Sequence, residues 1–160
     1  MKFNHLIEIN DPLNPLIDTL TREQLWQGLV LRAESPKLFV PWLDSCDLLS
    51  RSGDTLNREL RYSALVVRDT VTFFPQERVH YHVPPQGEIP TSSLTMSIEE
   101  PQAEMFFVRF EYDDGTGEIE STEEAFYNEF RRSAYLEADI DTIRIIRQMA
   151  DEGRLGARLI

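Results

Sequence analysis

The sequence predicts an α+β fold in which a curved antiparallel sheet of six to seven strands wraps around a long C-terminal helix, with two short helices after the first strand. Three observations predict it. Apolar residues occupy alternate positions through the middle of the chain, as in strands with one buried face. Helix-start signals occur near residues 21 and 35. A further start signal at Ser121 precedes a long amphipathic segment that runs toward Gly153.

The first strand lies at the start of the chain, where apolar and polar residues alternate from Phe3 to Ile9. His5 shares the parity of the apolar residues, which is typical of a core histidine with its hydrogen bonds satisfied. The segment 10–12, Asn-Asp-Pro, ends the strand because proline cannot donate to a sheet ladder and Asn and Asp favour turns.

Two helices of unequal length follow. Thr21 and Gln24 have capping-box spacing, in which each side chain satisfies the other residue's backbone amide. The apolar stripe behind this cap predicts the first helix and consists of Leu25, Trp26, Leu29, Val30 and Ala33. Ser35 and Pro36 form an N-cap and first-turn pair that predicts a short second helix, which Pro41 ends.

Between residues 43 and 112 the apolar period is two, which predicts an antiparallel meander. Turn residues interrupt it at 52–54, at Pro75, at 84–87, at Pro101 and at 113–115. The alternating segments, read from their apolar parity, are 56–62, 67–73, 79–83, 94–98 and 106–112.

The last helix has two apolar stripes on different faces. Phe126, Phe130 and Ala134 form the first stripe. The second stripe is rotated about the helix and comprises Leu136, Ile140, Ile143 and Ala150. Glu137 and Asp141 interrupt the first stripe, so either the helix changes packing partner or these carboxylates face a cavity.

Composition excludes several classes of protein. The 160 residues suit a single domain spanning 1–160, and 16 basic against 28 acidic residues give a net charge of −12. Such a surface repels nucleic-acid phosphates and anionic membranes. No segment suits stable membrane insertion, the start of the chain has no apolar signal core, and the lone Cys46 suits a reducing compartment, so we expect a cytoplasmic protein. The sequence does not specify an oligomeric state.

A curved sheet that grips a single helix leaves a gap between them, and that gap is the expected ligand site. Its predicted lining is the inward parity of the strands together with the first stripe of the last helix. This cavity comprises Leu56, Arg58, Leu60, Tyr62, Asp69, Val71, Phe73, Tyr81, Met96, Phe106, Val108, Phe110, Phe126, Phe130 and Ala134.

The element order resembles the helix-grip fold of the SRPBCC superfamily, which includes START lipid-transfer domains and polyketide cyclases. Three segments resemble more narrowly the AtaL-like family of uncharacterised microbial proteins: LTREQLWQGLVLRAESPKLFVP at 20–41, LNREL at 56–60 and YLEAD at 135–139. The resemblance spans almost the whole chain. It implies a deep apolar cavity, and it carries over no catalytic residue.

Arg58 and Asp69 are the charges of greatest interest, because both lie on the inward parity. A hairpin near residues 64–65 whose paired residue numbers sum to about 129 would set Arg58 opposite Val71 and diagonal to Asp69. The pair then either orients a polar ligand group or lies partly solvated near the strand ends. Tyr62, Tyr81 and Tyr112 share the inward parity, either as hydroxyl donors to a ligand or as core residues with hydroxyls at the rim.

The sequence predicts neither metal nor cofactor. His80 and His82 project from one face, but that face has the polar parity, and no third ligand is near. No phosphate loop, nucleophile elbow or zinc signature is present.

Three hypotheses for the function follow. The first is binding of a small or medium hydrophobic ligand, lipid- or polyketide-like. The second is a polyketide cyclase or aromatase in which Arg58, Asp69 and a tyrosine hold and enolise the substrate. The third is a regulatory module whose acidic surface meets a basic partner.

Overall fold

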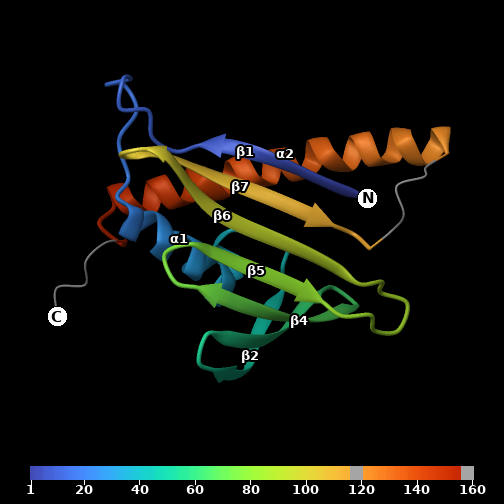
Figure 1. The fold of residues 1–160 in the computed structure, drawn as a ribbon. Coiled ribbons are helices and arrows are strands. Elements are labelled where there is room, and N and C mark those ends of the chain that lie inside the picture. The colour runs from blue at the N-terminus through green and yellow to red at the C-terminus, as the bar shows by residue number, and fades with distance from the viewer. Residues whose placement is uncertain (116–120, 156–160) are drawn as a thin grey trace.

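The computed structural model describes residues 1–115 and 121–155, and its strands form one seven-stranded antiparallel sheet (Figure 1). The order across the sheet is β1-β7-β6-β5-β4-β3-β2, so the first strand pairs with the last and the others form a meander. The strands are β1 Lys2–Glu8, β2 Ser45–Ser52, β3 Thr55–Tyr62, β4 Leu65–Phe74, β5 Arg78–Val83, β6 Ser92–Gln102 and β7 Met105–Asp113.

Two α-helices and one 3-10 turn complete the described fold: α1 Arg22–Glu34, η1 Pro36–Leu38 and α2 Thr122–Asp151. The predicted capping box at Thr21 of α1 is confirmed, and the predicted start of α2 at Ser121 is a capping box with Glu124. The predicted second helix is a single 3-10 turn that begins at Pro36. Gly153 lies just beyond α2 at φ 71°, a conformation that suits glycine and ends the helix where predicted.

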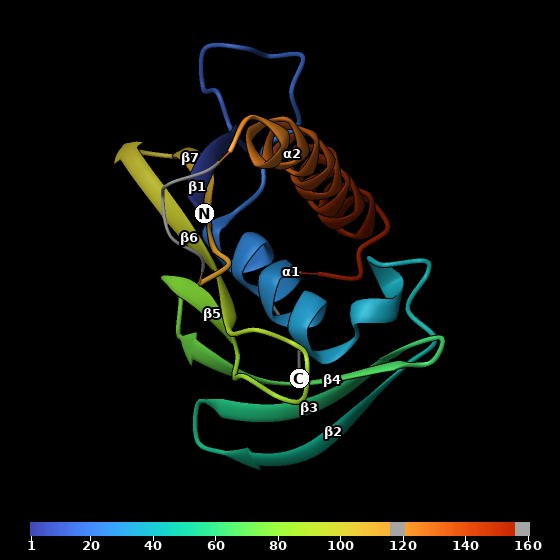
Figure 2. The ribbon, with the colours of Figure 1, turned by 90° about the vertical axis from the view of Figure 1, so that its right-hand side faces the viewer.

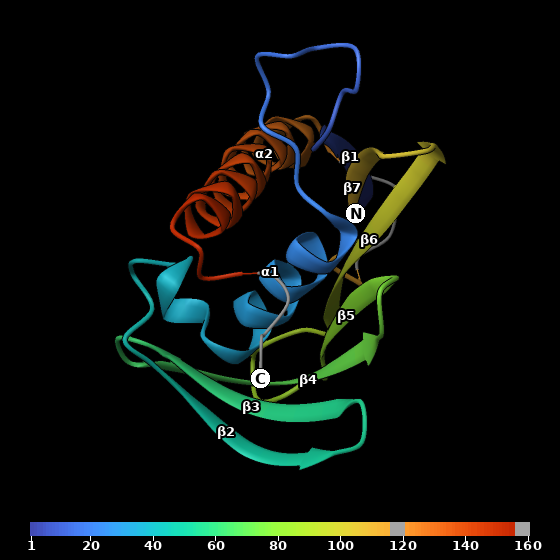
Figure 3. The same ribbon diagram turned by 90° about the vertical axis from the view of Figure 1, so that its left-hand side faces the viewer.

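The sheet curves around both helices, which Figures 2 and 3 show from opposite sides. In both views α1 lies in the hollow of the sheet, and α2 lies nearer to β1 and β7. The sequence prediction assigned the covering of the apolar face to the last helix alone. The correction is that α1 shares this role, because its buried stripe of Leu25, Leu29 and Ala33 belongs to the core.

The crossing of the two helices depends on Gly28. A Cβ atom placed there would lie 2.6 Å from Cγ2 of Ile146 on α2, far inside van der Waals contact. Ile146 is fully buried, so it has little room to move. The missing side chain at Gly28 therefore lets the helices approach each other.

The inward parity of the strands is confirmed where the sheet covers the helices. Leu56 and Leu60 of β3, Val71 of β4, Val79 of β5 and Phe110 of β7 are all buried. β2, which the predicted alternating segments did not include, is one of the two edge strands, and most of its residues are exposed. The predicted break at Pro101 falls near the end of β6, within the register shift between Glu99 and Gln102.

The register of the β3–β4 hairpin corrects one prediction. Arg58 pairs directly with Asp69, whereas the predicted register placed them on a diagonal. The turn is formed by Ser63 and Ala64, with Ser63 at φ 55°, and it closes the hairpin one residue earlier than expected. The two charged side chains therefore lie side by side on the inner face.

The first half of α2 corrects another prediction. Phe126 and Phe130 are 81% and 69% exposed, and Ala134 is exposed as well. Leu136 and Ile140 of the second predicted stripe are also exposed, at 40% and 49%. The buried face of α2 instead consists of Asp139, Thr142, Ile143, Ile146 and Met149. The reason is coverage, because the helix contacts α1 and β1 only along part of its length (Figure 1).

The segment between β1 and α1 is held by Asn10, which is 1% exposed. Its side-chain amide donates to the Leu20 carbonyl at 2.7 Å, and its side-chain oxygen accepts from the Leu20 amide at 2.9 Å. These two hydrogen bonds close the loop. Among the described residues, no helix is long and apolar enough to cross a membrane.

Candidate functional site

A cleft of about 430 Å³ opens between the inner face of the sheet and α2. Phe3 of β1, Tyr62 of β3, Asp69 of β4 and Tyr81 of β5 reach it from the sheet, and Tyr135 reaches it from α2. The remaining lining residues are Val83, Ile89, Pro90, Ser92, Ser93, Leu94, Tyr112, Asp113, Asp114 and Arg131. We refer to this space as the sheet–helix cleft.

Three aromatic rings from three elements form one wall of the cleft. Tyr112 of β7 stacks on Phe3 at 4.9 Å between ring centroids and on Tyr135 at 4.5 Å. The interplanar angles are 12° and 22°, so the rings lie nearly parallel. Phe3 and Tyr112 face each other because β1 and β7 pair in that register. Such a wall suits a flat apolar ligand.

Behind this wall lies a buried carboxylate that sequence reasoning missed. Asp139 of α2 is 0% exposed, and its oxygens accept the Tyr112 hydroxyl at 2.7 Å. The Nε2 atom of His5 lies 2.5 Å from the same carboxylate and donates to it when the acid is ionised. The position of Asp139 on the stripe that contains Ile143 and Ile146 was the available signal.

The surroundings of Tyr112 change the pKa of its hydroxyl. Burial raises the pKa of its hydroxyl far above the ordinary tyrosine value, and the adjacent Asp139 charge and hydrogen bond raise it further. The phenol therefore keeps its proton near neutral pH and directs it toward the carboxylate. Its oxygen remains at the cleft wall as a hydrogen-bond acceptor.

Arg58 and Asp69 form a two-bond ion pair that is nearly inaccessible to solvent. Arg58 donates from Nε and Nη2 to the two Asp69 oxygens at 2.9 and 2.6 Å. A third donor, Nη1, reaches the Ala33 carbonyl at the end of α1 at 2.8 Å. The Arg58 guanidinium is thus committed to joining the hairpin to α1, while Asp69 reaches the cleft.

Tyr81 lies at the inner end of the cleft beside two guanidinium groups. The central guanidinium carbon lies 5.1 Å from the Tyr81 ring centroid for Arg58 and 5.5 Å for Arg32. Tyr81 is 4% exposed, and its hydroxyl forms no hydrogen bond of normal geometry with any described residue. Arg32 interacts with that hydroxyl electrostatically.

The predicted cavity residues divide into three groups in the structure. Tyr62, Asp69 and Tyr81 line the cleft. Phe126, Phe130 and Ala134 do not, because they lie on the exposed face of α2. The others are buried in the packed interior away from the cleft lining: Leu56, Arg58, Leu60, Val71, Phe73, Met96, Phe106, Val108 and Phe110.

The carboxylates of Glu137 and Asp141, for which a cavity position was one of two alternatives, are exposed. Asp141 pairs with Arg144 at 3.4 Å on the outer surface. Asp139, between them, is the residue that turns inward. Glu137 and Asp141 each lie two positions from Asp139, which is about 200° around the helix, so they point to the opposite side.

Other polar side chains take structural positions. His80 Nδ1 lies 2.8 Å from Thr95 Oγ1, and burial lowers the pKa of His80. Burial raises the pKa of the Cys46 thiol. Within the described ranges, no three His, Cys, Asp or Glu side chains gather as a metal site would require.

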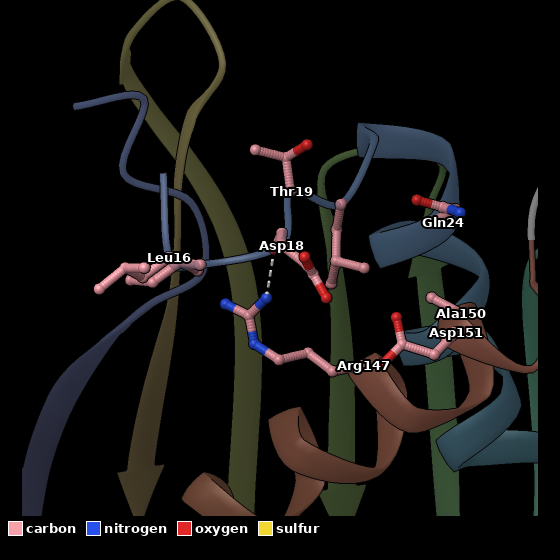
Figure 4. A pocket seen from close by; sticks show the side chains of 9 residues that line it. Leu16, Asp18, Thr19, Gln24, Arg147, Ala150 and Asp151 are labelled. Atoms are coloured by element: carbon pink, nitrogen blue, oxygen red, sulfur yellow. Dashed lines mark hydrogen bonds between the residues drawn. The ribbon is translucent and has the colours of Figure 1, made fainter. Parts of the chain in front are cut away.

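A second hollow, of about 370 Å³, lies between the loop before α1 and the end of α2 (Figure 4). Arg147 donates there to the Asp18 carbonyl at 2.8 Å and also to the Ile9 carbonyl. The hollow is lined on other sides by Thr19, Gln24 and Asp151. Because Arg147 is already bonded to the backbone, this hollow has the character of a loop anchor.

The curved seven-stranded sheet, the long C-terminal helix and the cleft between them define a helix-grip protein. The family model of AtaL, acetylaranotin biosynthesis cluster protein L, matches residues 7–153. The chain therefore belongs to the AtaL family. No curated protein matches the sequence significantly.

Solved structures similar to the chain share its fold at low sequence identity. The di-domain aromatase/cyclase StfQ of the steffimycin biosynthetic pathway superposes with a TM-score of 0.67 at 12% identity, over 94% of this chain and 51% of StfQ. The Zhui aromatase/cyclase from Streptomyces sp. R1128 gives 0.61 at 12% identity, over 94% and 93%. The Aha1 dimer from Colwellia psychrerythraea gives 0.55 at 18%, over 89% and 96%. The chain thus spans about half the length of StfQ.

Proposed function

We propose that this protein binds a small or medium-sized hydrophobic ligand with a flat ring system in the sheet–helix cleft. The observation that carries the proposal is the stacked wall of Phe3, Tyr112 and Tyr135 facing a cleft of about 430 Å³. Small-molecule sites typically occupy roughly 300–1,000 Å³ and combine apolar walls with a few convergent polar groups. Asp69 and Tyr81 supply such polar groups here.

The ligand class follows from the wall and from the relatives. Stacking against parallel aromatic rings favours a planar ligand over a flexible acyl chain. The similar StfQ and Zhui structures are described as aromatase/cyclases, StfQ from the steffimycin biosynthetic pathway. We therefore favour a polyketide-like ligand over a membrane lipid.

Titration with the fluorescent apolar probe N-phenyl-1-naphthylamine tests the proposal. The wild-type protein should bind the probe saturably, and Leu94→Trp should abolish binding because the indole fills the cleft. Leu65→Trp is the matched control, since Leu65 is half exposed on β4 and outside the lining. Circular dichroism verifies that both variants fold.

Equal probe binding by Leu94→Trp and the wild type would place the probe elsewhere and contradict the proposal. Native mass spectrometry of protein purified without added ligand provides an independent measurement. A co-purified small molecule that is lost in Leu94→Trp and kept in Leu65→Trp supports the cleft as its site.

A second candidate function is cyclase-like catalysis on the bound ligand. The observation that favours it is the buried Asp139 carboxylate, hydrogen-bonded to a tyrosine of the cleft wall. Asp139, Tyr112 and His5 form a continuous path along which a proton can move between the cleft and the interior. The sequence-based cyclase hypothesis used Arg58 to hold the substrate. In the structure, Arg58 already donates hydrogen bonds to Asp69 and to the Ala33 carbonyl, so we assign the catalytic role to Asp139, Tyr112 and His5 instead.

The cyclase hypothesis predicts that Asp139→Asn abolishes conversion of a poly-β-ketone thioester into a cyclised aromatic product, measured by its absorbance. Apolar probe binding should persist, because Asp139 is behind the cleft wall. Arg144→Gln on the exposed face of α2 is the control. No conversion by the wild-type protein, or full activity in Asp139→Asn, would leave ligand binding as the function.

A further inference from the structure

A cation without a carboxylate at ion-pair distance lies directly behind the inner end of the sheet–helix cleft, against the Tyr81 ring that lines it. Arg32, near the end of α1, is half-buried, and its Nε donates weakly to Thr142 Oγ1 at 3.4 Å. Within residues 1–115 and 121–155, no carboxylate lies at ion-pair distance from it. A guanidinium that is partly shielded from bulk water and has no counter-ion binds an anion strongly, because the ion pair removes the cost of the unpaired charge.

The neighbouring carboxylates already have other partners. Asp69 is held by both nitrogens of Arg58, and Asp139 is bound by Tyr112 and His5. At the mouth of the cleft, Asp114 pairs with Arg131 at 3.0 Å. No described acid therefore lies at ion-pair distance from Arg32, and the Asp139 carboxylate, held by Tyr112 and His5, acts on it only from farther away.

A buried donor lies beside this cation. The Tyr81 hydroxyl is buried, it donates its proton to no described residue, and Tyr81 lines the cleft, while the Arg32 guanidinium approaches the hydroxyl oxygen. The guanidinium groups of Arg32 and Arg58 lie against the Tyr81 ring. Their positive charge makes the Tyr81 hydroxyl a stronger hydrogen-bond donor and attracts an anion to it. A buried hydroxyl without a partner is costly, and a ligand acceptor would remove that cost.

We propose that the Arg32 guanidinium and the Tyr81 hydroxyl together bind an anionic oxygen of the ligand, so that the cleft takes an aromatic or polyketone-like acid in preference to a neutral compound. This inference rests on the proposed function, because it names the polar end of the same ligand. The flat part of the ligand lies toward the stacked wall of Phe3, Tyr112 and Tyr135, and its anionic oxygen lies at the inner end.

The test uses two near-isosteric competitors, 2-naphthoate and 2-naphthamide, which displace N-phenyl-1-naphthylamine. The wild-type protein should bind the anion at least about tenfold more tightly than the amide, as expected for hydrogen bonds to a charged group. Arg32→Gln and Tyr81→Phe should each remove most of this preference, because they lower naphthoate affinity far more than naphthamide affinity.

Matched variants make the test specific. Arg32→Lys keeps the charge and should retain part of the preference. Arg144→Gln makes the same charge change as Arg32→Gln on the outer face of α2 and should retain all of it. Tyr81→Phe removes a hydroxyl that donates to no described residue and keeps the buried ring, so it is the variant that decides if Arg32→Gln folds poorly.

Several outcomes overturn the inference. Equal wild-type affinity for the two competitors would do so, as would an unchanged preference in Tyr81→Phe and Arg32→Gln. Loss of the preference in Arg131→Gln alone would place the anion at the mouth of the cleft and also overturn it. Probe binding with no preference refutes this inference and leaves the proposed function intact, whereas no binding of the apolar probe refutes both.

Discussion

Asp139 shows how one residue sets the chemistry of the cleft wall. Its carboxylate is fully buried, which is rare for an acid unless hydrogen bonds compensate. Tyr112 and His5 provide that compensation, and the three side chains come from α2, β7 and β1. The network therefore fixes how the helix sits against the two terminal strands.

Tyr112 makes this network measurable through pH. The pKa of its hydroxyl is raised in the folded protein, chiefly by burial and then by Asp139, so above about pH 10 the unfolded chain releases a proton that the folded protein keeps. Stability should thus be unaffected by this group below pH 10 and should fall as pH rises above it, by at most about 1.4 kcal/mol per pH unit.

Tyr112→Phe should therefore flatten the alkaline decline in the free energy of unfolding, measured by urea titration between pH 9 and about 11.5. A residual slope should remain, because burial also raises the pKa of Tyr62. Tyr127→Phe, on the exposed side of α2, is the control and should keep the wild-type slope. Identical slopes in Tyr112→Phe and the wild type would show that Tyr112 ionises as it does in water.

The sequence predicted part of the site at the residue scale. Tyr62, Tyr81 and Asp69 could be found because strand parity assigns each residue to a face, and all three line the cleft. Asp139 was missed because acids are rarely buried and the predicted stripe of Leu136, Ile140, Ile143 and Ala150 does not include it. Arg32 gave no signal, since its partners come from elements far away in the chain.

At the scale of helices and strands, prediction succeeded where residues close in the sequence determine the structure. Alternation predicted the central strands, and capping boxes predicted both helix starts, because these patterns are local. The first half of α2 failed for the opposite reason. Phe126 and Phe130 have helical spacing typical of a core stripe, yet whether a surface covers them depends on how far α2 extends past β1.

The α1–α2 crossing carries a prediction at this scale. Gly28→Ala gains about 1 kcal/mol in helix propensity, but the new methyl group meets Ile146, and overpacking costs about 1–3 kcal/mol. We expect a net loss of up to about 2 kcal/mol, measured by urea unfolding.

A double-mutant cycle with Ile146→Ala separates this clash from other effects, because the smaller residue makes room for the methyl group. The cost of Gly28→Ala should be smaller in the Ile146→Ala background than in the wild type. Additive costs would show that the helices do not meet at this pair.

For the whole molecule, the negative charge is concentrated at the surface. The net charge of the chain is −12, and among residues 1–115 and 121–155 the buried charged side chains are Arg58, Asp69 and Asp139. Most of the excess negative charge therefore lies outside the core. Like charges at the surface repel one another and favour the unfolded chain. Added salt screens that repulsion, since the Debye length falls from about 30 Å at 0.01 M to about 8 Å at 0.15 M.

Thermal unfolding in sodium chloride tests this balance. Surface ion pairs such as Arg144–Asp141 also weaken in salt, but exposed pairs contribute only about 0–1 kcal/mol each, and the buried Arg58–Asp69 pair is screened much less. We therefore expect Tm to rise by about 2–4 °C between 10 mM and about 150 mM salt, which corresponds to about 1 kcal/mol for a chain of this size.

Glu137→Gln removes an exposed negative charge from α2 and should reduce the rise, whereas Arg144→Gln should enlarge it. A fall in Tm with salt would mean that the surface ion pairs outweigh the repulsion, and the acidic surface would then stabilise the fold instead of opposing it.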